Sequence, residues 1–224
     1  MLMGRGLTKR YGRQTVLENA CLEVQPGEGL ALMGKNGSGK TTLLSLLALA
    51  ARPDAGEITI DGLSPKTSRG ALGYAPQEIA LLEELTVEEN LRCWSALSRA
   101  DTGERLASLC AELDLDCVRR KRVDKLSGGQ RRRVNLAAAL MRNARYLLLD
   151  EPFSGVDADS KGRILSLLLE SLSRGCGIII ASHHPDTLRP LVQRIMELDH
   201  GKTTYCGPAD AYFTMKKLPG GDCL

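Results

Sequence analysis

Residues 34–41 have the composition and spacing of a phosphate-binding loop. They read Gly-Lys-Asn-Gly-Ser-Gly-Lys-Thr, which fits the pattern G-x-x-x-x-G-K-[ST]. The glycines permit a tight turn in which successive backbone N–H groups point into one concavity and wrap phosphates. Lys40 then supplies a positive charge at the β- and γ-phosphates, and Thr41 can place its hydroxyl on a Mg²⁺ ion. The residues expected to contact the nucleotide are Gly34, Asn36, Gly37, Ser38, Gly39, Lys40, Thr41 and Thr42.

Two consecutive carboxylates follow a second apolar run. Asp150 and Glu151 come directly after Tyr-Leu-Leu-Leu at residues 146–149, which predicts a buried strand. Side chains at the carboxyl end of such a strand lie where open α/β sheets bind ligands. We expect Asp150 to hold Mg²⁺ with its hydration shell, and Glu151 to orient and deprotonate an attacking water.

Residues 126–130 form a second candidate anion site. They read Leu-Ser-Gly-Gly-Gln and precede an apolar pattern of helical spacing over residues 130–141. The N-terminus of a helix attracts anions through its free N–H groups and its dipole. We expect contacts from Ser127, Gly128, Gly129 and Gln130. Two phosphate-binding helix starts far apart in one chain require a second nucleotide or a second copy of the chain.

The remaining patterns predict an α/β fold. Apolar runs over residues 30–33, 177–181 and 195–198 indicate strands that alternate with helices at 41–50 and 159–172, as in a parallel sheet. Residues 20–24 and 57–60 predict antiparallel strands near the N-terminus. Residues 81–124 are helical and interrupt the alternation, with a capping-box pair at Thr86 and Glu89. We interpret them as a helical lobe inserted into a single domain that covers residues 1–224.

Composition excludes several classes of protein. The chain has 224 residues and a net charge of +3, with 30 Lys plus Arg against 27 Asp plus Glu and 4% aromatic residues. Neither the charge nor the aromatic content favours a nucleic-acid partner, and we expect none. No apolar run approaches the roughly 18 residues that span a bilayer. The seven Cys include no C-x-x-C pair, which is typical of a reduced, intracellular chain.

Taken together, these motifs resemble the ATP-binding subunits of ATP-binding cassette (ABC) transporters. Tyr11 stands where that family has an adenine-stacking aromatic, and Gln77 in Tyr-Ala-Pro-Gln matches its Q-loop glutamine. Residues 154–157 resemble its D-loop, and His183 after the strand at 177–181 matches its switch histidine. The resemblance implies a P-loop NTPase core, with the helical lobe of about residues 81–124 extending into the signature helix.

The resemblance also implies cofactors, site residues and partners. The cofactors are ATP and Mg²⁺, with Thr41, Gln77 and Asp150 at the metal. Lys40, Gln77, Glu151 and His183 are the implied catalytic residues. A second ABC ATPase subunit, identical or closely related, docks head to tail so that Ser127 and Gly129 of one copy close on the γ-phosphate held by Lys40 of the other. An integral membrane permease is the other partner, and it holds the ATPase at the cytoplasmic face of the membrane.

Several alternatives remain open from the sequence. His184 follows His183 where many relatives have Asp, so His184 is a second candidate for the switch role. A soluble ABC ATPase that moves no solute, such as an iron-sulfur assembly type, is the alternative function. The Leu-Thr-Val-Glu-Glu-Asn stretch at residues 85–90 and the short chain resemble small-exporter systems and favour export. The transported substrate is not readable from these residues.

Overall fold

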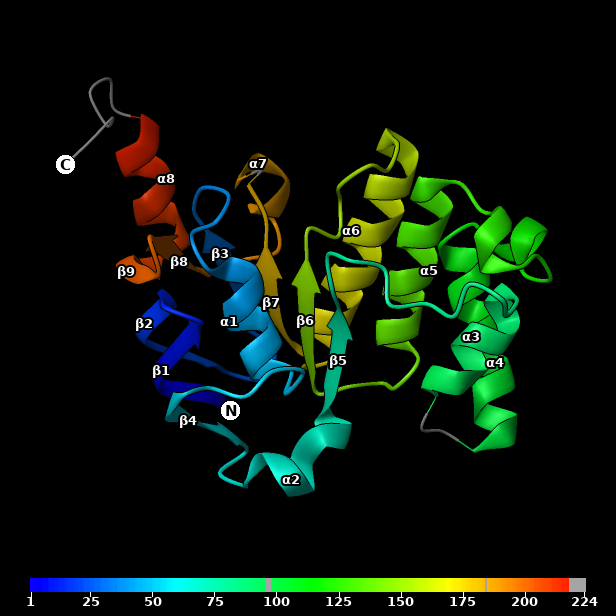
Figure 1. Ribbon diagram of the computed structural model, residues 1–224. Helices are drawn as coiled ribbons and strands as arrows, with labels where there is room; N and C mark the ends of the chain where they lie inside the picture. Colours follow the sequence, from blue (N-terminus) through cyan, green and yellow to red (C-terminus); the bar gives the residue numbers. More distant parts are fainter. Residues whose placement is uncertain (96–97, 184, 218–224) are drawn as a thin grey trace.

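The structure is a computed structural model that describes residues 1–95, 98–183 and 185–217. Its strands form two sheets (Figure 1). The smaller sheet is antiparallel, with the order β2-β1-β4, and comprises β1 (Leu2–Tyr11), β2 (Gln14–Val24) and β4 (Ala55–Ile60). The larger sheet has the order β5-β6-β7-β3-β8-β9. Its members are β3 (Gly29–Met33), β5 (Leu72–Ala75), β6 (Tyr146–Asp150), β7 (Gly177–Ala181), β8 (Arg194–Asp199) and β9 (Lys202–Pro208).

The larger sheet is parallel except for its last strand. β5, β6, β7, β3 and β8 pair in parallel, and β9 pairs antiparallel with β8. Every residue of β3, β6 and β7 is buried, as continuous apolar runs predict for strands covered on both faces. These three strands end at the same edge, which brings the segments that follow them together. The predicted α/β class and mostly parallel sheet are confirmed.

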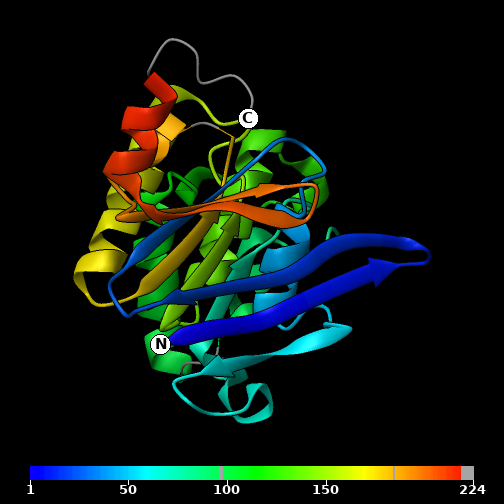
Figure 2. The same cartoon turned by 90° about the vertical axis from the view of Figure 1, so that its left-hand side faces the viewer.

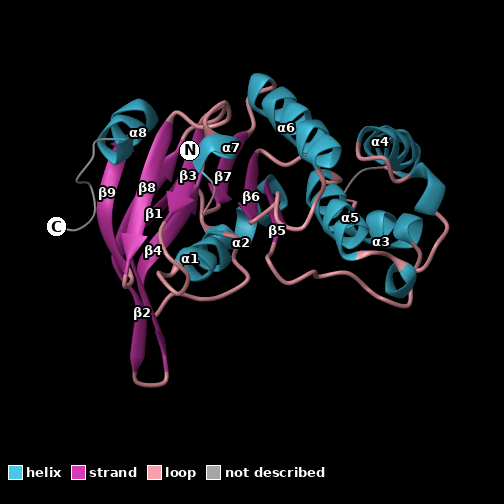
Figure 3. Ribbon diagram, turned by 90° about the horizontal axis from the view of Figure 1, so that it is seen from above, coloured by secondary structure: helices cyan, strands magenta, loops and turns pink. Residues whose placement is uncertain are grey.

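Helices cover both faces of the larger sheet. α1 (Lys40–Leu47) packs between the two sheets, where Leu43 and Leu44 share a core with β1 and β6 residues. α5 (Gly128–Leu140) and α6 (Ala158–Ser173) cover the other face, as the view from above shows (Figure 3). The helix predicted over residues 41–50 ends early, because Leu49 adopts a positive φ of 59°, which α-helices exclude.

The helical lobe contains α3 (Val87–Trp94) and α4 (Arg99–Glu112), followed by the short 3₁₀ turns η2 (Asp116–Val118) and η3 (Val123–Lys125). The predicted capping box begins α3: Glu89 N donates to Thr86 Oγ1 at 3.2 Å, and Thr86 N donates to Glu89 Oε2 at 2.8 Å. The spacing of Val87, Leu91, Trp94 and Leu97 predicts one apolar face for this helix, but Trp94 is 41% exposed. Leu97, expected on the same face, lies outside the described residues.

Some elements carry too weak a pattern to be predicted. These are the four-residue strand β5, which contains Gly73, the one-turn helices α2 (Pro65–Ser68) and α7 (Pro185–Leu188), the 3₁₀ turn η1 (Arg69–Ala71), and α8 (Ala209–Lys217). β1 and β2 are long strands whose hairpin projects from the body of the protein (Figure 2). No helix among the described residues is both long and apolar enough to cross a membrane.

The contrast between two adjacent leucines of α6 tests the packing of this helix. Leu168 is 0% exposed and Leu169 is 38% exposed. We expect Leu168→Ala to lower the free energy of unfolding by about 2–5 kcal/mol, because it leaves a cavity between α6 and the sheet. The matched control, Leu169→Ala, should lower it by well under half as much. Urea unfolding followed by circular dichroism measures both. Equal losses would contradict the observed orientation of α6.

Candidate active site

The loop between β3 and α1 requires glycine at several positions. Gly34 has a φ of 138°, and a Cβ atom there would lie 2.2 Å from Leu198 O. Gly39, with a φ of 106°, precedes α1, and its Cβ would lie 2.9 Å from Val16 O. Other residues would be strained or would clash at these positions. The backbone of residues 34–39 can therefore curl closely around the N-terminus of α1.

Lys40 occupies the concavity of this loop. Its Nζ donates to Gly34 O at 2.7 Å and to Lys35 O at 3.0 Å, and the residue is only 7% exposed. Burial lowers the pKa of Lys40, while the nearby carboxylates of Glu151 and Asp150 oppose this shift. The ammonium group is thus held in place by loop carbonyls and has acidic neighbours across the cleft.

Asp150 is the last residue of β6 and is 2% exposed. Burial raises the pKa of its carboxyl group, while a hydrogen bond from the Thr41 side chain lowers it. Its Oδ2 atom is buried and has no hydrogen-bond partner within the described structure. A buried carboxylate oxygen without a partner, next to a threonine hydroxyl, is a donor set that suits Mg²⁺. In the described part of the chain, no three His, Cys, Asp or Glu side chains gather as a metal site, so phosphate and water oxygens would have to complete the coordination.

Glu151 and His183 form a close pair. His183 Nδ1 lies 2.7 Å from Glu151 Oε1. Glu151 has a positive φ of 50°, and its N–H donates to Ala181 O at 2.9 Å, so the backbone turns sharply after β6. Glu151 Oε2 is buried without a hydrogen-bond partner in the described residues, and it remains available to a water molecule. The alternative histidine, His184, lies outside the described residues.

These groups converge on one cleft of about 360 Å³. The cleft is lined by Val16, Asn36, Gly37, Gly39, Lys40, Thr41, Thr42, Gln77, Asp150, Glu151, Ser154 and His183. Most of the predicted site residues are therefore brought together. No sequence pattern predicts Val16 here, because it comes from β2 and reaches the loop only through the packing of the two sheets. Gly34 and the buried Ser38 belong to the loop but do not line the cleft.

Tyr11 lies apart from this cleft. It is the last residue of β1, at the turn of the projecting hairpin (Figure 2), and is 53% exposed. Its ring is covered by Lys9 Nζ, at 5.5 Å from the ring centroid, and it does not line the cleft. Stacking of Tyr11 on adenine stays a prediction.

The second candidate anion site is a capped helix start. Ser127 precedes α5, its Oγ accepts from Gln130 N at 3.3 Å, and its own N–H donates to Gln130 Oε1 at 3.0 Å. Gly128 is exposed, and a Cβ atom there would meet nothing within 4 Å. None of the four residues 127–130 lines the cleft. Within one chain, the two predicted phosphate sites therefore stay separate.

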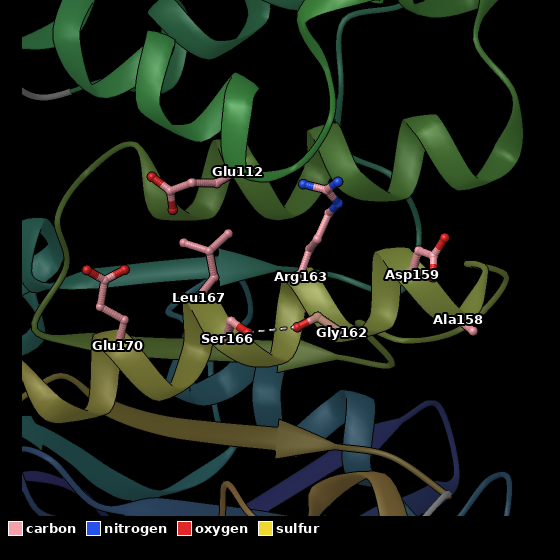
Figure 4. Close-up of a pocket in the computed structure, with 8 residues that line it drawn as sticks. All are labelled: Glu112, Ala158, Asp159, Gly162, Arg163, Ser166, Leu167 and Glu170. Carbon is pink, nitrogen blue, oxygen red and sulfur yellow. Dashed lines mark hydrogen bonds between the residues drawn. The ribbon is translucent and has the colours of Figure 1, made fainter.

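A larger hollow, of about 650 Å³, lies along α6 and lacks the features of a phosphate site (Figure 4). Its lining includes three carboxylates, Glu112, Asp159 and Glu170, and one guanidinium, that of Arg163. Ser166 Oγ is used in a 3.1 Å hydrogen bond to Gly162 O within the helix. Clustered carboxylates repel phosphate, so this hollow does not compete with the cleft as the nucleotide site.

Burial of the Asp150 carboxylate predicts a pH-dependent cost in stability. Because the pKa of Asp150 is raised in the folded protein, ionisation lowers the free energy of unfolding as the pH rises above the unfolded pKa of about 3.9. We expect Asp150→Asn to melt at a higher temperature than the unsubstituted protein at pH 7, without nucleotide or Mg²⁺. The difference should disappear as the pH approaches about 4.

Calorimetry across this pH range measures the effect. The control is Asp199→Asn, since Asp199 also ends a strand but its side chain is 55% exposed. This substitution should change the melting temperature little. If Asp150→Asn melts at a lower temperature than the unsubstituted protein at pH 7, then burial of the Asp150 carboxylate does not destabilise the folded protein, and the prediction is wrong.

Several known proteins are similar to this chain over most of its length. The family model described as ABC transporter matches residues 17–154. The chain is 33% identical over 216 residues to the lipopolysaccharide export system ATP-binding protein LptB of Acidithiobacillus ferridurans, covering 92% of this chain and 90% of that protein. It is 34% identical over 229 residues to the Fe(3+) ions import ATP-binding protein FbpC 2 of Rhodococcus jostii, covering 98% of this chain and 66% of that protein.

A solved structure of similar fold supports the same assignment. It is the dimeric, post-hydrolysis state of the ATP-binding cassette MJ0796 bound to ADP and Pi, with a TM-score of 0.83 and 26% identity. The match covers 93% of this chain and 99% of that chain. With the family model matching more than half of the chain, the protein belongs to the ABC transporter family, as an ATP-hydrolysing cassette.

Proposed function

We propose that this chain is the ATPase subunit of an ABC transporter and powers export through a separate membrane subunit. The observation that carries the proposal is the convergence of Lys40, Asp150, Glu151 and His183 on one cleft from separate segments of the chain. Each side chain has the chemistry that phosphoryl transfer to water needs, and three of them are held buried before any ligand arrives. A single domain over residues 1–224 is part of this proposal.

The residues of the cleft have different roles in the proposed hydrolysis. The backbone N–H groups of residues 37–41 and the Lys40 ammonium hold the phosphates, since the start of α1 adds positive potential there. Mg²⁺, held by Thr41, Asp150 and Gln77, would neutralise phosphate charge. Glu151 accepts the proton of the attacking water through its free Oε2, and His183 fixes the carboxylate through Oε1. Water adds to the γ-phosphorus, and ADP leaves.

The signature residues complete the site of a second subunit. Ser127 and Gly129 lie outside the cleft of their own chain, and Gly128 leaves the start of α5 open. In the proposed head-to-tail dimer they close on the γ-phosphate held by Lys40 of the other copy. The relative bound to ADP and Pi is dimeric, which supports a dimer for this chain. ATP closes the dimer, and hydrolysis opens it.

The membrane partner has a candidate docking groove of about 550 Å³ between the core and the helical lobe. Its walls come from residues 48–50 after α1, from β5, from α5 and from Trp94 of α3, and they are largely apolar. We propose that a cytoplasmic segment of the permease docks there and holds the ATPase at the membrane. Export is favoured by the stretch at residues 85–90. LptB is named for export, and FbpC 2 for import, so the direction rests on that stretch.

Replacement of the proposed general base tests the mechanism. We expect Glu151→Gln to bind ATP but to lose hydrolysis by about a hundredfold to ten-thousandfold, the contribution of a general base. Phosphate release measures the rate, and gel filtration with ATP should detect a stalled dimer. Glu170→Gln, on the exposed face of α6, is the matched control and should turn over normally. Near-normal turnover in Glu151→Gln would remove Glu151 from the role of base.

Recovery of a membrane partner separates the proposed function from the soluble alternative. Affinity purification of the tagged chain from detergent-solubilised membranes of its host should yield a polytopic membrane protein. Trp94→Ala should reduce that recovery several-fold and leave the ATPase rate intact, because Trp94 lines the groove and not the cleft. Leu63→Ala serves as the control, because Leu63 is 57% exposed and lines neither the groove nor the cleft. Consistent absence of a membrane protein would favour an iron-sulfur assembly ATPase.

A further inference from the structure

The segment that carries Gln77 is hydrogen-bonded to α5 at three points. Asn135 Nδ2 donates to Pro76 O at 3.0 Å, and Ala80 N donates to Asn135 Oδ1 at 3.4 Å. Between these two bonds, Arg132 donates from a terminal guanidinium nitrogen to Gln77 O at 2.7 Å. Residues 76–80 follow the short strand β5 and belong to no helix or strand. Their position is therefore set by the helix that they face.

Asn135 lies in the middle of α5 and is 3% exposed. Asparagine is unfavourable in helix interiors, because its side chain competes for backbone hydrogen bonds. Here the amide instead satisfies a carbonyl and an N–H group of the Gln77 segment. A buried amide with both ends occupied fixes two backbone groups in relation to one helix position.

Arg132 is distinct from the arginines on either side of it. Arg131 bonds to Glu83 and to Asp124 O, and Arg133 bonds to Leu113 O and to Asp114. Both neighbours therefore tie α5 to the helical lobe. Arg132 alone of the three reaches the Gln77 segment, and its charge is close enough to Asp150 to lower the pKa of that carboxyl group. Arg132 therefore interacts with two residues that line the cleft, Gln77 and Asp150.

We propose that Arg132 and Asn135 are positioning residues that fix the backbone of Gln77 relative to Asp150. The inference rests on the proposed function, in which Gln77 takes part in catalysis at the bound metal. It adds a consequence for the dimer. α5 begins beside Ser127, which serves the nucleotide of the other subunit, and Arg132 lies about 7.5 Å further along the same helix. A shift of α5 at one nucleotide therefore moves Gln77 at the other.

Steady-state ATP hydrolysis by full-length variants tests the role of Arg132. We expect Arg132→Ala to lower kcat about tenfold or more, because misplacing a reacting group by about an ångström carries such a cost. The KM for ATP should change less than twofold, since the phosphates are held by residues 34–41. Arg132→Lys keeps a donor for Gln77 O and should recover much of the rate. Arg131→Ala, which loses only contacts to the lobe, is the matched control and should retain it.

A double-mutant cycle with Gln77→Ala separates positioning from general damage. If Arg132 acts through Gln77, then Arg132→Ala should cost little further activity in the Gln77→Ala background. An equal loss in both backgrounds, or unchanged turnover in Arg132→Ala, would overturn the inference and leave the proposed function standing. Unchanged turnover in Gln77→Ala would overturn both the proposed role of Gln77 and the inference.

Hydrogen exchange gives a readout that is independent of activity. In Asn135→Ala, the amide of Ala80 loses its acceptor, so exchange in residues 76–80 should speed up at least several-fold. Exchange in the 3₁₀ turn η2, which Asn135 does not touch, should stay the same. Unchanged exchange in residues 76–80 would overturn the part of the inference that concerns Asn135. Should Asn135→Ala fail to fold, the Arg132 series decides the proposal without it.

Discussion

The alignment of three parallel strands is the constraint on which the site depends. Ala181 pairs with Leu32 of β3 on one side and with Asp150 of β6 on the other. One row of the sheet therefore joins the ends of β3, β6 and β7. Because side chains beyond that row leave the sheet at the same edge, the glycine loop, the two carboxylates and His183 meet there. Slippage of one strand by a single residue would turn Asp150 to the opposite face of the sheet.

Burial of charge is the second organising feature. Lys40, Asp150 and Glu151 are each less than a tenth exposed, although isolated buried charges are costly. Loop carbonyls hold the Lys40 ammonium, while Asp150 Oδ2 and Glu151 Oε2 lack partners in the described structure. Both residues line the cleft in which phosphates and a cation would bind. These buried charges lower the free energy of unfolding, but they lie where binding and catalysis need preorganised charge.

The helical lobe is joined to this edge through α5. The same helix begins at the signature residues, bonds to Gln77 O through Arg132, and carries the buried Asn135. Arg131 and Arg133, on either side of Arg132, bond to the lobe. One helix thus contacts the lobe, the Gln77 segment and, in the proposed dimer, a second nucleotide. The proposed docking groove for the permease lies against the same helix.

The local features of this protein could be predicted from its amino-acid sequence. The phosphate loop, the carboxylates after β6, the capping box of α3 and the buried strands depend on residues close together in the chain, so their patterns are readable without the fold. The other features depend on long-range packing. It paired the short strand β5, placed Val16 in the cleft and Tyr11 away from it, and sent Arg132 to Gln77 while its neighbours bind the lobe. Those outcomes depend on contacts between segments far apart in the chain. Packing decides these contacts, and no local sequence pattern predicts them.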